Sequence, residues 1–293
     1  MSTQVPIVSD TGHAAGRALA ALVPVWPFAA ILGLFVLLAA LAPLIAPYGP
    51  ASQDLLARLR PPGFAAGGKL YLLGTDEVGR DLLSRILYGA RISLAVAFVS
   101  VCASLAVGAW LGMLAGYFRG TIETVVMRAT DIVLSIPPIL LAILMVAVLG
   151  PSLGNLILVL AFTRWPRYAR VAYGQTLGVA GALYVRAAHF HGAGTGRVLW
   201  RHVMPNILAP LIVVATLEFG LMILFEAGLS FLGLGVQPPT PSWGSIMSVG
   251  RNYIGSAWWI ATLPGIGLFL VVLSVNVIGD HMRDRFDPRS INR

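Results

Sequence analysis

Charged side chains and cysteine are both scarce in this sequence. Asp, Glu, Lys and Arg make up 11% of the 293 residues, against about a quarter in ordinary soluble domains, and 57% of the residues are hydrophobic. This composition excludes a soluble globular protein and predicts several membrane spans. The single cysteine, Cys102, lies in an apolar run, so neither an intrachain disulfide nor a thiolate metal cluster is possible.

Lysine is also nearly absent, which excludes one energy-converting motif. The only lysine, Lys69, is followed by Leu, so the chain has no Gly-Lys-Ser/Thr phosphate-binding loop. The histidines at 189, 191 and 202 have no carboxylates beside them, so we expect them to face solvent or a partner. We therefore expect no catalytic residue, no cofactor and no metal, and energy for any transport must come from a partner or an ion gradient. The net charge of +8 indicates basic cytoplasmic edges better than it indicates nucleic-acid binding.

Apolar segments of membrane-spanning length predict an all-α, polytopic protein with six transmembrane helices, because a bilayer core needs about 20 apolar residues. The predicted spans are 28–46, 92–117, 132–148, a fourth from about 153 that continues past Arg164, 205–235 and 260–278. Pro137-Pro138 predicts a kink in the third span. Arg164, Arg167 and Arg170 are expected to snorkel toward the cytoplasmic interface.

Small residues and side-chain pairs give further local predictions. Gly108, Gly112 and Gly116 share one helix face and predict close approach of a second helix. Arg128 and Asp131 are spaced for an ion pair on one helix. An aromatic belt is predicted from Trp243, Tyr253, Trp258 and Trp259.

A polar segment precedes the second span. Thr75, followed by Asp76, Glu77 and an apolar stripe that includes Leu82 and Ile86, predicts the start of an amphipathic helix on the membrane surface. Its acids and arginines have the spacing of surface ion pairs, which we prefer to a carboxylate active site.

Two carboxylates, Glu218 and Glu226, lie deep in the fifth span. Acids in a membrane are costly, and are therefore candidates for a functional role. We expect both to face other protein or a water-filled path. A proton relay through them, as in a secondary transporter, is the alternative.

The segment 181–205 is too polar to cross a bilayer, although spans flank it. Apolar residues at near-helical spacing, interrupted by glycines at 192, 194 and 196, predict two short helices joined by a turn. Pro205 is placed to open the next helix, where its missing N–H is no loss.

This segment resembles the EAA loop of the permease subunits of bacterial ABC importers. The resemblance is carried by Ala187-Ala188, by Gly192 four residues later, and by Met204-Pro205. Arg186 stands where the family has Glu, His202 where it has Ile and Met204 where it has Leu. In the family this loop docks onto the ATPase subunit, so the resemblance makes Arg186, Ala187, Ala188, Gly192, Met204 and Pro205 a coupling element.

Three further stretches resemble the C-type subunits of dipeptide, oligopeptide and nickel importers. They are LGTDEVGRDLLSRILYGARISL at 73–94, FLGLGVQPPTPSWG at 231–244 and GDHMRDRFDPR at 279–289. The resemblance implies a type I ABC importer permease fold that forms half of a path for di- or oligopeptides. Nickel or another small solute is the alternative.

The resemblance also implies partners and a place in the cell. The partners are a second homologous permease subunit, two cytoplasmic ABC ATPases, an extracytoplasmic solute-binding protein and membrane lipid. The resemblance implies that the protein lies in the bacterial inner membrane. We divide the chain into an N-terminal part (1–91), a transmembrane domain (92–283) with its coupling loop at 181–205, and a cytoplasmic tail (284–293). Thirteen of the 20 basic residues lie on the side that holds both termini, which predicts that this side is cytoplasmic.

Overall fold

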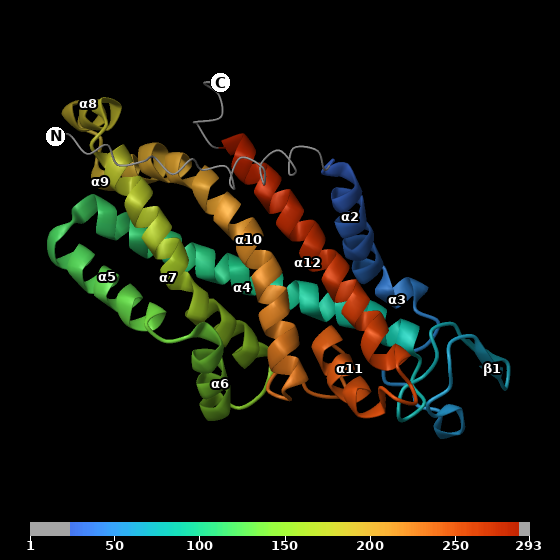
Figure 1. The fold of residues 1–293 in the computed structure, drawn as a ribbon. Helices are drawn as coiled ribbons and strands as arrows, with labels where there is room; N and C mark the ends of the chain where they lie inside the picture. Colours follow the sequence, from blue (N-terminus) through green and yellow to red (C-terminus); the bar gives the residue numbers. More distant parts are fainter. Residues whose placement is uncertain (1–23, 287–293) are drawn as a thin grey trace, which may run out of the picture.

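The computed structural model describes residues 24–286, which form a bundle of inclined helices with a small hairpin at one end (Figure 1). The longer helices are α2 (Trp26–Ala40), α4 (Leu82–Phe118), α5 (Gly120–Leu134), α6 (Pro138–Leu149), α7 (Leu153–Ala180), α10 (Met204–Phe231) and α12 (Trp259–Phe286). The short helices are α3 (Ala42–Ile45), η1 (Leu55–Ala57), α8 (Leu183–Phe190), α9 (Thr195–Val198), η2 (Leu199–Val203), α11 (Trp243–Gly250) and η3 (Arg251–Tyr253). Strands β1 (Phe64–Ala66) and β2 (Lys69–Tyr71) pair antiparallel, with Phe64 opposite Tyr71. Residues 1–23 and 287–293 lie outside the described residues, and so does most of the predicted cytoplasmic tail at 284–293, of which 284–286 end α12.

The predicted all-α class is confirmed, and the six predicted spans are compatible with the helices. Within the described residues, three helical stretches are long and apolar enough to cross a membrane, and these are 82–118, 195–231 and 259–285. A fourth crossing results if α5 and α6 are counted together. Helix α2 is apolar but has 15 residues, and α7 has 28 residues but carries arginines near its middle. The predicted boundary between residues 91 and 92 lies within α4.

The break in the third predicted span is sharper than a kink. Helices α5 and α6 are bent by 91° relative to one another. Pro137 and Pro138 cannot donate the backbone hydrogen bonds that would continue α5, and Pro138 instead opens α6. The predicted pair of Arg128 with Asp131 was wrong, since Asp131 pairs with Arg170 of α7 at 2.5 Å.

Helix α4 runs behind α7, α10 and α12 and forms the centre of the bundle (Figure 1). Its glycine stripe packs on α7 as predicted. A methyl group on Gly108 would meet the backbone of Trp165 and Ala169, and one on Gly112 would meet the carbonyl of Ala169. The small residues therefore set the closeness of these two helices.

The predicted amphipathic surface helix was wrong. Helix α4 begins only at Leu82, where Asp81 accepts hydrogen bonds from the Ser84 backbone N–H at 2.8 Å and from its hydroxyl at 2.7 Å. Before it, Gly79 adopts a left-handed φ of +76°, which ends any earlier helix. The first turn of α4 is buried and continuous with the second span, so it does not lie on the membrane surface.

The ion pairs of this segment are buried, whereas the sequence predicted surface pairs. Asp76, only 1% exposed, pairs with Arg80 at 2.6 Å and with Arg85 at 3.4 Å. Thr75 donates its hydroxyl to the Ala57 carbonyl and accepts from the Arg60 N–H. Residues 73–81 and the first turn of α4 therefore form a folded cap at one end of the bundle, which accounts for the polar residues of this signature.

The predicted aromatic belt is only partly formed. Trp258 is exposed, but Trp243 is fully buried and donates its indole N–H to the Ile86 carbonyl at 3.1 Å. Trp259 is also buried and donates to the Thr75 carbonyl at 3.2 Å. These two indoles join α11 and α12 to the cap, so tertiary hydrogen bonds account for their position.

Candidate functional site

The segment that links α7 to α10 forms the two short helices that the sequence predicted. Helix α8 ends at a turn in which Gly192 adopts a φ of +80°, and α9 and the π-helical η2 then lead into α10. Within the turn, the Ala193 N–H donates to the Ala188 carbonyl at 3.0 Å. No atom lies within 4 Å of the place where a Gly192 side chain would begin, so backbone conformation, and not crowding, accounts for this glycine.

One face of this segment is anchored on the bundle. Val185, Val198, Leu199 and Val203 are buried in a cluster with residues of α4, α7 and α10. In addition, the Tyr117 hydroxyl at the end of α4 lies 2.6 Å from the Nε2 atom of His189. The segment is therefore held by its inner face and presents its outer face to the surroundings.

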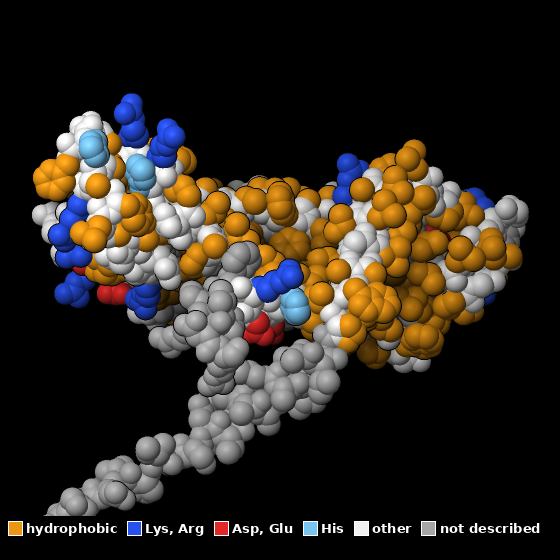
Figure 2. Space-filling model, turned by 90° about the horizontal axis from the view of Figure 1, so that it is seen from above, with side chains coloured by type: hydrophobic (Ala, Val, Ile, Leu, Met, Phe, Trp, Pro, Cys, Tyr) orange, Lys and Arg blue, Asp and Glu red, His pale blue; other side chains and the backbone are white. Residues whose placement is uncertain are grey.

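The outer face combines apolar and basic groups. Leu183 is 83% exposed and Phe190 is 91% exposed. Arg186 and Ala187 are exposed on the same short helix, whereas Ala188 packs partly against the cluster. Figure 2 shows hydrophobic, basic and histidine side chains together over this end of the molecule. Exposed large apolar side chains beside charges are typical of a protein-binding surface.

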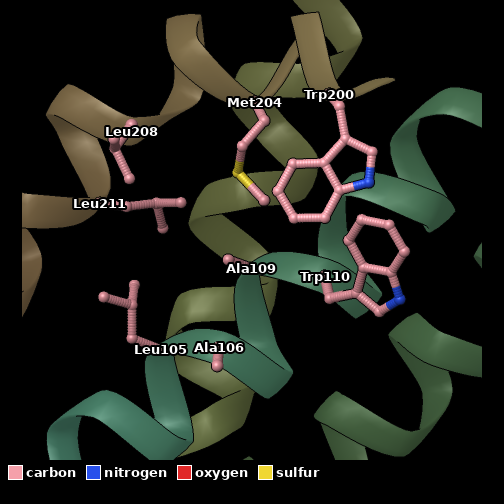
Figure 3. A pocket seen from close by; sticks show the side chains of 8 residues that line it. All are labelled: Leu105, Ala106, Ala109, Trp110, Trp200, Met204, Leu208 and Leu211. Carbon is pink, nitrogen blue, oxygen red and sulfur yellow. The ribbon is translucent and has the colours of Figure 1, made fainter. Parts of the chain in front are cut away.

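The junction of the segment with α10 contacts α4 directly. Trp200 and Met204 point toward Ala109 and Trp110, and the two indole rings lie 5.4 Å apart (Figure 3). They border an apolar cavity of about 310 Å³. Pro205 lies in the first turn of α10, as predicted. The linking segment is therefore in contact with both α10 and α4.

The two intramembrane acids have separate surroundings. Glu218, 1% exposed, lies 2.9 Å from Arg167 and 3.6 Å from Arg164. Glu226, fully buried, accepts a hydrogen bond from the Ser230 hydroxyl at 2.7 Å. Within residues 24–286 no hydrogen bond joins the two carboxylates. The two carboxylates therefore have different partners, arginines for Glu218 and a serine hydroxyl for Glu226.

Arg164 corrects one prediction and supplies a partner that sequence reasoning missed. Its side chain is 9% exposed and its guanidinium lies 4.2 Å from the centre of the Phe225 ring. It is thus turned into the protein and does not snorkel toward an interface. A carboxylate deep in a membrane protein requires a cationic partner. In the sequence, the arginines of the fourth span were the feature that could have indicated this partner.

Metal binding finds no support in the described residues. Among residues 24–286 no group of three or more His, Cys, Asp or Glu side chains is arranged to hold an ion. His189 is instead in contact with Tyr117, and the His202 ring lies 6.4 Å from that of Tyr184. His189 and His202 therefore contact aromatic side chains, and His189 and His191 are exposed as predicted.

Comparison with known families identifies the chain. Residues 108–292 match the family described as binding-protein-dependent transport system inner membrane component. The chain belongs to this family. Residues 28–62 also match the N-terminal transmembrane domain of oligopeptide transport permease C. The chain is thus a membrane component of a binding-protein-dependent transporter, and components of this kind are not enzymes.

Curated relatives of this transport component are similar over most of their length. The di/tripeptide transport system permease protein of Pseudomonas aeruginosa is 46% identical, over 88% of this chain and 86% of the relative. The dipeptide transport system permease protein of Haemophilus influenzae is 42% identical, over 89% of this chain and 90% of the relative. That of Escherichia coli K12 is 44% identical, over 84% of this chain and 82% of the relative.

Solved structures confirm the predicted type I importer permease fold of this transport component. A chain of the inward-facing MetNI methionine ABC transporter gives a TM-score of 0.57 at 21% identity, over 72% of this chain and 98% of that chain. A chain of an amino acid ABC transporter gives a TM-score of 0.51 at 14% identity, over 70% of this chain and 95% of that chain. At these identities the likeness shows the fold alone.

Proposed function

We propose that this chain is the membrane-spanning permease subunit of an ABC importer for di- or oligopeptides. It would form half of the translocation path beside a second homologous permease. Two cytoplasmic ATPases would supply the energy, and a solute-binding protein would deliver the peptide from outside. The names of the relatives support the peptide class, and their identity over most of both chains supports the transfer of that class.

The surface for the ATPase is the outer face of residues 183–205. The observation that carries this assignment is the contrast between its two faces. Its inner face is buried against α4, α7 and α10, and its outer face presents Leu183, Phe190 and Arg186. A segment anchored in this way moves as one piece with the helices, so closure of the ATPases would shift α10 and open the path outward.

The orientation follows from this assignment. Both termini and residues 183–205 would lie in the cytoplasm, and the β1–β2 hairpin would lie outside. Figure 1 supports this orientation, because the hairpin and the linking segment lie at opposite ends of the bundle. The majority of the basic residues on the cytoplasmic side agrees with it.

A pair of glycine substitutions tests the coupling role. Gly192→Ala and Gly194→Ala each add one methyl group in the same turn, and neither would meet an atom within 4 Å. Only Gly192 has a positive φ, where a non-glycine residue is disfavoured by about 1 kcal/mol or more. We expect Gly192→Ala to lower peptide-stimulated ATP hydrolysis in the reconstituted importer, with unchanged amounts of subunit in the membrane. Gly194→Ala should behave like the parent.

Charge reversal tests the outer face independently. Arg186 stands where the EAA loops of related permeases carry Glu. The ATPase subunit that binds this chain should therefore present an acidic or neutral surface opposite Arg186. Arg186→Glu should leave the fold intact, because the side chain is exposed, and should weaken coupling of ATP hydrolysis to uptake. If Arg186→Glu and Gly192→Ala both hydrolyse ATP and transport like the parent, residues 183–205 are not the coupling element.

A further inference from the structure

Arg167 is a half-exposed cation at the middle of the bundle. It is the fifteenth of the 28 residues of α7, and Glu218 is the fifteenth of the 28 residues of α10. Each therefore lies roughly 20 Å from either end of its helix. The Arg167 side chain is nevertheless 54% exposed. An arginine at this depth is costly to expose to lipid, so its outer part requires water or a polar partner.

The charges around Arg167 do not balance. Arg164 and Arg167 share the single carboxylate of Glu218. Arg164 is buried and lies over the Phe225 ring, so its position is fixed within the protein. Arg167 is the member of the cluster that reaches the surface. One further carboxylate next to it would give two anions for two cations.

The neighbouring surface of α7 is polar on the same side. Arg170, three residues later, pairs with Asp131 of α5, so its charge is already neutralised. Phe162 lies about 140° around α7 from Arg167, on a face lined by apolar residues of α4 and α7. The polar side is suited to a water-filled path, and the apolar side to acyl chains.

We propose that Arg167 contacts the solute in the translocation path and binds the carboxylate of the passing peptide. This inference rests on the proposed peptide permease function. Arginine has five N–H donors in a planar fork, so one edge of Arg167 can bind Glu218 while another binds the peptide. Glu218 is then a positioning residue that holds the guanidinium at the surface. Solutes without an anionic group would lose this contact.

Thiol accessibility tests whether Arg167 faces the path. Because Cys102 is the only cysteine, Cys102→Ser provides a cysteine-free subunit for Arg167→Cys and for the control Phe162→Cys, whose native side chain is 44% exposed. The complete importer in proteoliposomes is treated with a membrane-impermeant thiol reagent. We expect labelling at position 167, slowed by dipeptide with binding protein and ATP, and little labelling at 162. Position 167 labelling no faster than 162, or unaffected by dipeptide, would overturn the inference.

Uptake kinetics separate a solute contact from a purely structural ion pair. Arg167→Gln should lower kcat/KM for dipeptide uptake by roughly tenfold or more, which is the scale of a lost charge-assisted hydrogen bond. Arg167→Lys keeps the positive charge and should retain part of the parent's kcat/KM. Arg170→Gln is the control, because its charge is neutralised by Asp131. In the double variant Arg167→Gln/Glu218→Gln the carboxylate that Arg167 neutralises is also absent, and we expect uptake to stay as low as in Arg167→Gln.

The outcomes of these experiments distinguish failure of this inference from failure of the proposed peptide permease function. A parent importer that takes up no dipeptide would overturn the proposed function and this inference together. A working parent whose double variant regains normal uptake would overturn the inference alone, because Arg167 would then serve only to neutralise Glu218.

Discussion

Replacement of Gly112 by alanine tests the packing on which the bundle depends. The added methyl group would overlap the carbonyl oxygen of Ala169 most severely, and it would also meet the carbonyl carbon at 2.8 Å and the Cα atom at 2.9 Å, whereas ordinary contact begins at 3.4 Å. The obstacle is backbone, so no rotamer change relieves it. Helix α7 must move by about 1 Å or more, and a gap of that size forfeits roughly half of each neighbouring dispersion contact.

The loss of stability expected for Gly112→Ala follows from that displacement. Overpacking of this kind costs about 1–3 kcal/mol. Gly33→Ala is the matched control, because Gly33 lies within α2 with no atom within 4 Å of its added methyl group. There the better helix propensity of alanine should stabilise by up to about 1 kcal/mol.

Thermal unfolding of the purified complex in detergent measures the difference. At roughly 2–4 °C for each kcal/mol in a chain of this size, Gly112→Ala should melt about 2–12 °C below the parent. Gly33→Ala should melt at or above the parent. Equal melting temperatures for the two variants would refute the view that the glycine stripe sets the α4–α7 distance.

Other substitutions test the acids, the helix start and the orientation. Glu218→Gln leaves two arginines without their carboxylate and should lower the free energy of unfolding by about 3 kcal/mol or more. Glu226→Gln replaces an acid bound to a hydroxyl and should cost much less. Chemical unfolding of both variants measures the two losses, and equal losses would show that the ion cluster is unimportant. Asp81→Ala removes the N-cap of α4 and should cost about 1 kcal/mol in the same assay, with Asp81→Asn close to the parent. A reporter active only in the cytoplasm should work after Gly181 and fail after Gly67, and a signal at Gly67 would reverse the orientation.

The sequence predicted those features that depend on neighbouring residues. The turn at Gly192, the helix start at Pro205 and the close face of Gly108 and Gly112 all follow from what single residues allow the backbone to do. Periodicity and composition likewise predicted the helical class. Such properties act within a few residues, so they are visible before the chain folds.

The errors concern side chains whose partners lie far along the chain. Asp131 pairs with Arg170, 39 residues away, and not with its helical neighbour Arg128. Trp243 donates to a carbonyl 157 residues earlier, so it is buried where an interfacial position was predicted. A charge or an indole signals that a partner is needed, but only the packing of the helices decides which partner it obtains.

Glu218 lies on the helix that joins the proposed ATPase-binding segment to the proposed solute contact at Arg167. Residues 181–203 are the only covalent link between α7 and α10, and the Arg167–Glu218 pair joins the same two helices near their midpoints. A force applied to the outer face at Phe190 therefore acts on both helices below it. Any sliding of α10 along α7 must stretch the 2.9 Å contact between Glu218 and Arg167. A peptide carboxylate that binds Arg167 would compensate for that stretching, so solute in the path would favour the displaced arrangement over the resting one.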